Sequence, residues 1–395
     1  MSNHVKSEVR DNILYIFVEG RIDSSNAAAT EEEIVNLRSG NEDKSVIIDA
    51  DKLEYISSAG LRVILRVRKD VPNLKLVNVN SDVYEILDMT GFTEMMTVEK
   101  AFRKLSVEGC EVIGKGSNGE VYRLDPDTII KVYLNPDCLP DINRERELAR
   151  KAFILGIPTA IPYDVVKVGD TYGSVFELLN AKSLTKILAA EPEKVDEVVK
   201  IYVDLLKKIH STEVKPDDMP DMKQVVIGWV KDIRGQIDDA KWQKLYNLVE
   251  AVPDSNKMIH GDYHTKNIMV QNGEVLLIDM DTLCHGDPVF EFASIFNAYK
   301  GFYGGYAPIT GLSFIGIDFN VGLEVWKKTL ISYFGTDDEK KLEEIEDKSA
   351  LIGYTRILRR TLRRCDLSNP ETANAVEFYK KTIETITDKI DKLTF

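Results

Sequence analysis

The segment with the clearest chemical potential runs from His260 to Asn267 and reads His-Gly-Asp-Tyr-His-Thr-Lys-Asn. Asp262 lies five positions before Asn267, and an apolar stretch at residues 276–278 leads directly into Asp279. These residues supply a carboxylate that can accept the proton of a substrate hydroxyl and two oxygen ligands suited to Mg²⁺. Each aspartate alone would be an ordinary turn former or helix cap. The ordered set predicts phosphoryl transfer.

A glycine-rich loop precedes this segment by about 140 residues. Gly114, Gly116 and Gly119 have the spacing Gly-x-Gly-x-x-Gly and lie between two β-rich stretches, at 111–113 and 121–124. Glycines at this spacing let backbone N–H groups approach phosphates closely. A dinucleotide-binding loop would require a helix next, whereas a strand follows here. The pattern therefore favours a hairpin that covers a nucleotide, with an ordinary hairpin as the alternative.

Lys131 is the one charged residue in the apolar run Ile129–Tyr133. The two-residue period of a strand turns it away from the face that carries Ile130 and Val132. We interpret it as a cation for nucleotide phosphates, held by a glutamate from the helical run at 144–148. The alternative is an edge-strand lysine that protects against aggregation.

The elements that position these residues fall into two regions. In the first, apolar periodicity predicts alternating strands and helices, with Gly91 as a stop signal and with Leu61, Ile64, Leu65 and Arg68 on one helical stripe. The predicted strands are 13–18, 46–48 and 74–77, and the predicted helices are 24–37, 58–69 and one around 83–87. This alternation indicates an α/β domain over residues 1–104. From residue 105, strand-like segments continue to about Phe176, and helical patterns follow to the end.

Composition narrows the functional classes. The chain has 51 Lys and Arg residues against 65 Asp and Glu residues, a net charge of −14. This acidity argues against nucleic acid and anionic membranes as partners. The four cysteines are isolated, which predicts neither a disulfide framework nor a zinc site. Without a signal-like segment or a membrane-spanning apolar run, we expect a cytoplasmic protein.

The motifs of residues 105–395 resemble the aminoglycoside phosphotransferase/choline kinase family, protein-kinase-like enzymes whose catalytic loop reads His-Gly-Asp-x-x-x-x-Asn. The resemblance implies an α+β bilobal fold, with an N-lobe at about 105–178 and a C-lobe at about 179–395. It also implies ATP and Mg²⁺ as cofactors and a small-molecule hydroxyl as acceptor. The acceptor itself is not readable from the sequence.

The same resemblance implies roles for individual residues. Asp262 would be the catalytic aspartate, Lys131 would hold the phosphates and pair with Glu145, and Asn267 and Asp279 would bind magnesium. The implied nucleotide-binding residues are Gly114, Gly116, Ser117, Asn118, Gly119, Val121 and Lys131, with Phe176, Glu177 and Leu179 at the hinge. Glu291 departs from the family, which has an aspartate at this position to brace the catalytic loop. We expect the change to adjust the fit without abolishing activity.

The first hundred residues resemble the STAS domain of bacterial anti-sigma factor antagonists, above all in the segment 55–65. The resemblance implies an interaction module, with a possible protein partner, that is controlled by phosphorylation of a serine at a helix start. Such members usually read Asp-Ser-Ser/Thr-Gly-Leu. Here Ser57 takes the aspartate position and Ala59 a hydroxyl position, which leaves Ser58 as the candidate phosphorylation site. The alternative is that Ser58 only caps the helix.

Two other functions stay open. The enzyme could be a protein serine kinase that acts on Ser58 or on a partner, or the kinase-like part could bind nucleotide without turnover as a signalling scaffold. Near the C-terminus, five arginines share one helical stretch: Arg356, Arg359, Arg360, Arg363 and Arg364. They predict either a solvated face with acidic neighbours or a site for an anionic substrate or docking partner.

Overall fold

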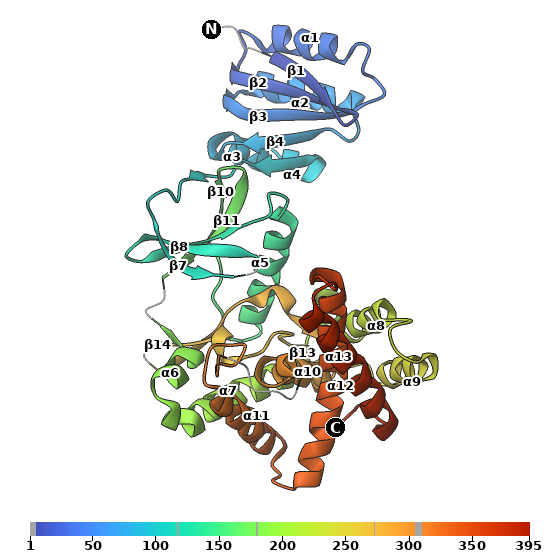
Figure 1. Ribbon diagram of the computed structural model, residues 1–395. Helices are drawn as coiled ribbons and strands as arrows, with labels where there is room; N and C mark the ends of the chain where they lie inside the picture. Colours follow the sequence, from blue (N-terminus) through green and yellow to red (C-terminus); the bar gives the residue numbers. More distant parts are fainter. Residues whose placement is uncertain (1–4, 117, 179–180, 272, 305–309) are drawn as a thin grey trace. The chain divides into compact units, whose positions relative to one another are not determined.

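The computed structural model describes residues 5–116, 118–178, 181–271, 273–304 and 310–395 (Figure 1). The chain divides into two compact units. The first runs to Ser106 and includes Val165–Asp170; the second comprises Val107–Asp164 and Thr171–Phe395. Two of the residues assigned to the nucleotide site, Ser117 and Leu179, lie outside the described residues.

The first unit is built on a five-stranded sheet with the order β1-β2-β3-β4-β5. Strand β1 is antiparallel to β2, and the other neighbours are parallel. Leu14, Ile16 and Val18 alternate into the core along β2. The elements are β1 (Val5–Arg10), β2 (Ile13–Ile22), α1 (Ala27–Arg38), β3 (Ser45–Ile56), α2 (Ser58–Asp70), β4 (Lys75–Val79), α3 (Ser81–Met89), α4 (Phe92–Met95) and β5 (Thr97–Lys100). The short β6 (Lys104–Leu105) pairs in parallel with the end of β10 (Asp164–Val168). The predicted α/β alternation is confirmed.

The buried stripe of α2 differs from the predicted one. Gly60, Val63, Ile64 and Val67 are buried, whereas Leu61 and Leu65 are only partly buried. A Cβ on Gly60 would come within 2.6 Å of the Ile56 side chain. The helix therefore approaches the sheet on its glycine side. Hydrophobic periodicity missed this rotation because it gives a glycine no weight.

The second unit opens with antiparallel strands in the order β7-β8-β9-β11: β7 (Glu111–Lys115), β8 (Gly119–Asp125), β9 (Thr128–Tyr133) and β11 (Thr171–Glu177). Helix α5 (Leu139–Ile154) follows β9. Because β9 lies between β8 and β11, the edge-strand alternative for Lys131 is wrong.

A helical lobe with a small three-stranded sheet and a strand pair completes the unit, as Figure 1 shows. Its core includes α7 (Val195–Ser211) and α10 (Pro288–Tyr299), and every residue of α10 from Val289 to Tyr299 is buried. The elements are β12 (Lys182–Ser183), α6 (Leu184–Ala190), α7 (Val195–Ser211), α8 (Met222–Asp232), α9 (Asp239–Glu250), β13 (Met258–Ile259), β14 (Ile268–Gln271), β15 (Glu274–Leu277), β16 (Cys284–His285), α10 (Pro288–Tyr299), α11 (Phe319–Phe334), α12 (Glu339–Arg364) and α13 (Pro370–Lys389). A sheet lobe followed by a helical lobe confirms the predicted α+β bilobal class.

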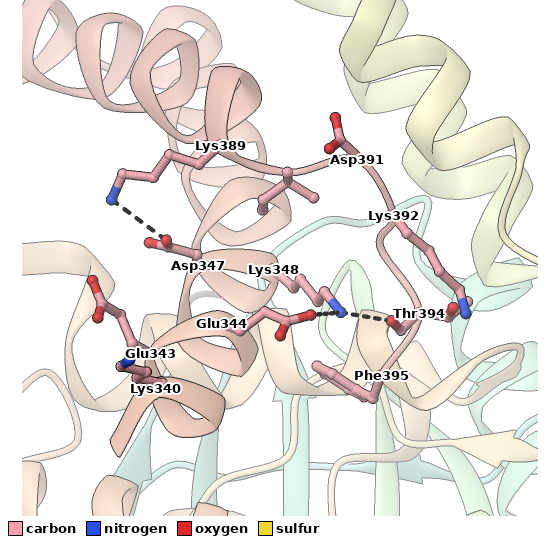
Figure 2. Close-up of a pocket in the computed structure, with 11 residues that line it drawn as sticks. Lys340, Glu343, Glu344, Asp347, Lys348, Lys389, Asp391, Lys392, Thr394 and Phe395 are labelled. Atoms are coloured by element: carbon pink, nitrogen blue, oxygen red, sulfur yellow. Dashed lines mark hydrogen bonds and ion pairs between the residues drawn. The ribbon is translucent and has the colours of Figure 1, made fainter. Parts of the chain in front are cut away.

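The last residues of the chain line a cavity of about 550 Å³ beside α12 (Figure 2). Lys348 donates to the carbonyl oxygen of Thr394 at 2.8 Å and pairs with Glu344 at 2.6 Å. Asp347 and Lys389 form a second pair at 3.5 Å. The hydrogen bond from Lys348 thus attaches the C-terminal segment to α12. The charged side chains around the cavity pair with one another.

All four cysteines are free, as expected. None of the helices in the described part of the chain has the length and apolar character that a membrane crossing requires.

Candidate active site

The catalytic loop is a tight turn between β13 and β14. Gly261 has φ +80°, and a Cβ there would come within 2.6 Å of the carbonyl oxygen of Thr282. Only glycine fits this position without strain. The hydroxyl of Thr282 donates to the carbonyl of His260 at 2.8 Å, and the 3₁₀ turn Thr265–Asn267 closes the loop. The turn thereby fixes where Asp262 stands.

Glu291, on the first turn of α10, braces this loop through hydrogen bonds to its backbone. Its Oε2 accepts from the backbone N–H of His260 at 2.5 Å, and its Oε1 accepts from that of Gly261 at 3.0 Å. The side chain is fully buried, so both carboxylate oxygens need such donors. The longer glutamate therefore occupies the bracing position that the sequence assigned to it.

Asp262 faces the solvent side of the loop with its side chain 41% exposed. His264 Nε2 lies 3.5 Å from its Oδ2, and an Arg356 nitrogen lies 3.9 Å from its Oδ1. Burial opposes ionisation, but the hydrogen bond and charge of His264, followed by the charge of Arg356, hold the pKa of Asp262 well below its usual value. The carboxylate is thus ionised and available to accept a hydrogen bond from a hydroxyl.

Lys131 connects the two lobes through carboxylates. Its Nζ lies 3.2 Å from both carboxylate oxygens of Glu145 on α5 and 3.4 Å from Oδ1 of Asp279. Tyr133 also donates to Glu145, at 3.0 Å. Burial disfavours the charged lysine, but the attraction of Glu145 and then of Asp279 outweighs it and raises the pKa of Lys131. The lysine therefore carries a fixed positive charge at this point.

Asp281 was not assigned from the sequence, yet it belongs to the same cluster. It follows Asp279, which has the left-handed φ of +64°, in the 3₁₀ turn Met280–Thr282. Burial, then repulsion by Asp279 and by Glu145, raises the pKa of Asp281 to about 7. Several carboxylates thus converge on one lysine, an arrangement that favours added cations.

A cavity of about 400 Å³ lies at this cluster. It is lined by Asn118, Lys131, Tyr133, Leu134, Asn135, Cys138, Asp141, Arg144, Glu145 and Asp281. The cavity thus borders the glycine loop, the pair of Lys131 and Glu145, and Asp281. Such a lining suits a phosphate chain with its cations.

The glycine loop is a hairpin in which Gly116 N–H donates to the carbonyl of Gly119 at 2.9 Å. A Cβ on Gly119 would collide with the carbonyl of Val132, so the position accepts only glycine. Val121 is the register partner of Lys131, and Gly114 lies opposite Val121 on the other strand. The hairpin is therefore held in register with the strand that carries Lys131.

The predicted hinge residues lie at the end of β11. Phe176 pairs with Ile129 and Glu177 with Thr128, and the N–H of Leu178 donates to the carbonyl of Asp127 at 2.7 Å. From here the chain passes to the helical lobe.

Asn267 fits a magnesium ligand. Its amide nitrogen donates to the carbonyl of Asp262 at 3.1 Å, and its Oδ1 has no hydrogen-bond partner within the described residues. No group of three or more His, Cys, Asp and Glu side chains in the described segments could hold a metal alone. Magnesium commonly takes one or two protein oxygens and completes its shell with phosphates and water. Asn267 and Asp279 suit such a shared site.

The five arginines of α12 have different partners in the structure. Arg356 donates to the carbonyl of Gly261 at 2.9 Å, which ties α12 to the catalytic loop. Arg359 and Arg363 both approach Asp232. The sequence showed the cluster but not these contacts, because Arg356 and Gly261 are 95 positions apart.

The sheet lobe with its glycine hairpin and the helical lobe with its braced loop together define a protein-kinase-like fold. Residues 109–307 match the phosphotransferase enzyme family, and residues 4–105 match the STAS domain. A putative anti-sigma factor antagonist, BtrV of Bordetella bronchiseptica, is 33% identical over 92 residues, 22% of this chain and 78% of that protein. The chain thus belongs to the phosphotransferase enzyme family and carries an N-terminal STAS domain.

Two solved structures share the fold. The ADP-bound aminoglycoside phosphotransferase APH(2'')-Ib has a TM-score of 0.50 at 14% identity, with 80% of this chain and 99% of that chain covered. The apo form of a thermostable mutant of APH(4)-Ia also has a TM-score of 0.50, at 12% identity, with 72% and 97% covered. Both predicted resemblances are confirmed.

Proposed function

We propose that the protein transfers the γ-phosphate of ATP to a hydroxyl of a small molecule in a Mg²⁺-dependent reaction, and that the STAS domain is its regulatory or protein-interaction module. The observation that carries the proposal is the Lys131 contact, which reaches Glu145 on one lobe and Asp279 on the other. Membership of the phosphotransferase family supports it. The ADP of the similar APH(2'')-Ib structure supports an adenine nucleotide as donor.

The geometry supports a mechanism of placement and charge stabilisation. Lys131 holds the phosphate chain beneath the glycine hairpin, and its pairing with Glu145 keeps the ammonium group in place. Asp262 accepts the hydrogen bond of the acceptor hydroxyl and takes up its proton. Asn267 and Asp279 would hold Mg²⁺, which neutralises charge on the phosphates. Glu291 preserves the loop geometry throughout.

The direct test is Asp262→Ala, assayed by ATP consumption over a set of hydroxylated metabolites. We expect turnover to fall by about 10²–10⁴-fold, the usual contribution of a positioned base, while the thermal transition is retained. Asp254→Ala is a matched control, because that aspartate is exposed and its ion pair among the described residues is with Lys223. An unchanged rate in the Asp262 variant would reject the assignment.

A second candidate function is phosphorylation of a STAS serine, either in this chain or in a partner. It is favoured by one observation: Ser57, not Ser58, caps α2 through its hydroxyl, which accepts from Ala59 N–H at 3.2 Å. The capping alternative for Ser58 is therefore wrong. Ser58 is exposed at the first helical position, where the free N–H groups and the helix dipole favour a phosphate.

Intact-mass measurement after incubation with Mg·ATP tests this second function. The expected product carries one added phosphate that Ser58→Ala removes and Ser57→Ala does not. An unmodified chain would exclude the reaction within this chain. Nucleotide binding without any phosphate transfer would support the scaffold alternative, against which the joint presence of Lys131, Asp262, Asn267 and Asp279 argues.

A further inference from the structure

Helix α12 brings a positive charge to the acceptor side of the catalytic loop. Arg356 is partly buried, with its side chain 29% exposed, and its guanidinium lies 5.3 Å from the ring centre of Trp229. The same group bonds to Gly261 and stands 3.9 Å from the Asp262 carboxylate. This guanidinium therefore stands next to the carboxylate that we propose as the base for the acceptor hydroxyl.

Two of the remaining arginines are neutralised by one acidic residue. Arg359 lies 2.5 Å and Arg363 lies 3.5 Å from the same oxygen of Asp232, on α8. They attach α12 to α8, and for this part of the cluster the expected pairing with acidic neighbours is found. Arg360 is different.

Arg360 lies four residues beyond Arg356, on the same face of the helix and about 6 Å further along its axis. It is exposed, and among the described residues no carboxylate pairs with it. Its guanidinium lies 5.9 Å from the ring centre of Phe302, which stacks on Phe314 at 4.3 Å. An aromatic support of this kind holds the guanidinium while leaving its N–H groups free for a planar anion.

We propose that Arg360, with Arg356, forms an anion-binding subsite beside Asp262, and that the acceptor carries a phosphate or carboxylate as well as its hydroxyl. The inference rests on the proposed phosphotransferase function and names its substrate class. The separation of the two arginines sets the scale of the distance between the hydroxyl and the anion. A cationic acceptor would approach two guanidinium groups and be repelled.

The test compares sugars that differ in one group: glucose 6-phosphate and glucuronate as anions, glucose as the neutral member and glucosamine as the cation. ADP release by the full-length chain is measured with Mg·ATP. We expect the anionic probes to give the highest kcat/KM, and the two anions together distinguish phosphate from carboxylate. Arg360→Gln should raise KM for the preferred anion by about tenfold or more at nearly unchanged kcat, as expected when a charge-assisted hydrogen bond is lost. Arg360→Lys should restore part of the loss.

Arg364→Gln is the matched control, because Arg364 is also exposed on the last turn of α12 and has no ion pair in the described part of the chain. A binding measurement accompanies the kinetics: saturation-transfer NMR of the same four probes with the chain saturated by Mg·AMP-PNP. Preference for glucose or glucosamine, equal binding of anionic and neutral probes, or an anion effect that survives Arg360→Gln would overturn the subsite. Failure of the proposed function is a separate result, namely no ADP release that depends on Asp262 with any acceptor class.

Discussion

The catalytic loop of the second unit and the start of α2 in the first unit both hold a polar side chain at a turn, but by opposite means. Ser57 is held by its own neighbours, because its hydroxyl accepts from backbone N–H groups two and three residues further along, and Ser58 follows it at the first helical position. Asp262 is arranged by distant segments: Glu291 from α10 and Arg356 from α12 both hold its loop. The comparison teaches that the proposed modification site is built from adjacent residues, whereas the proposed catalytic carboxylate depends on contacts from two distant helices of its lobe.

Among the contacts that join distant segments, the largest expected effect concerns the charged contact between the lobes. Lys131→Met should lower kcat/KM by about 10²–10³-fold, because a preorganised cation for the phosphates is lost and the carboxylates of Glu145 and Asp279 lose their shared partner. Steady-state ADP release is the measurement. Lys200→Met, which removes an exposed pair with Asp204 at 2.6 Å, is the control and should change nothing. Similar losses in both variants would contradict the assigned role.

The next prediction compares the stability lost when each of two glycines is replaced by alanine. Gly261→Ala should destabilise the helical lobe by about 3 kcal/mol, because its positive φ and a backbone carbonyl leave no room for a methyl group. At Gly60 the nearest atoms that a Cβ would meet belong to the side chains of Ile56 and Ile22 and not to a backbone, so Gly60→Ala should cost about 1–2 kcal/mol in the first unit. Urea unfolding followed by hydrogen exchange assigns each loss to its unit. The reverse order would show that the loop is less constrained than its contacts indicate.

Glu291→Gln tests the brace. A glutamine has one acceptor oxygen, so one of the two backbone N–H groups loses its partner, and we expect a loss of about 2 kcal/mol. Turnover should fall more than nucleotide affinity, because the loop rather than the glycine hairpin is disturbed. Glu291→Asp shortens the side chain but keeps both acceptors, and it should retain more activity. Equal activity of the two variants would argue against bracing.

The smallest effect belongs to the local motif. Ser57→Ala should reduce protection of the Ala59 and Gly60 amides against hydrogen exchange, with a cost of about 1 kcal/mol, the usual value of an N-cap. Ser58→Ala should leave these amides nearly unchanged, since the Ser58 hydroxyl is not their acceptor. An equal loss in the two variants would remove the distinction between cap and phosphorylation site.

The same difference explains what could be predicted from the sequence. Asp262 and Asn267 are five positions apart, so their joint presence was visible in the chain. The selection of Glu145 from a run of charged residues came only from resemblance, because spacing alone does not separate it from Glu147. Asp281 was missed, since its raised pKa arises from burial and from Asp279 and Glu145 after folding. Contacts such as Arg356 with Gly261 depend on the packing of α12 and leave no local signal.

The position of Glu291 on α10 also limits which substitutions the lobe can accept without disturbing the catalytic loop. Glu291 sits on a helix whose other residues form the core of the lobe, among them Phe292 and Phe296 against Trp326. A substitution in that aromatic core therefore moves the catalytic loop as well as the fold. Arg360, by contrast, is exposed on α12 and does not belong to this core. New acceptor preferences can thus arise there while the chemistry of the loop is inherited unchanged.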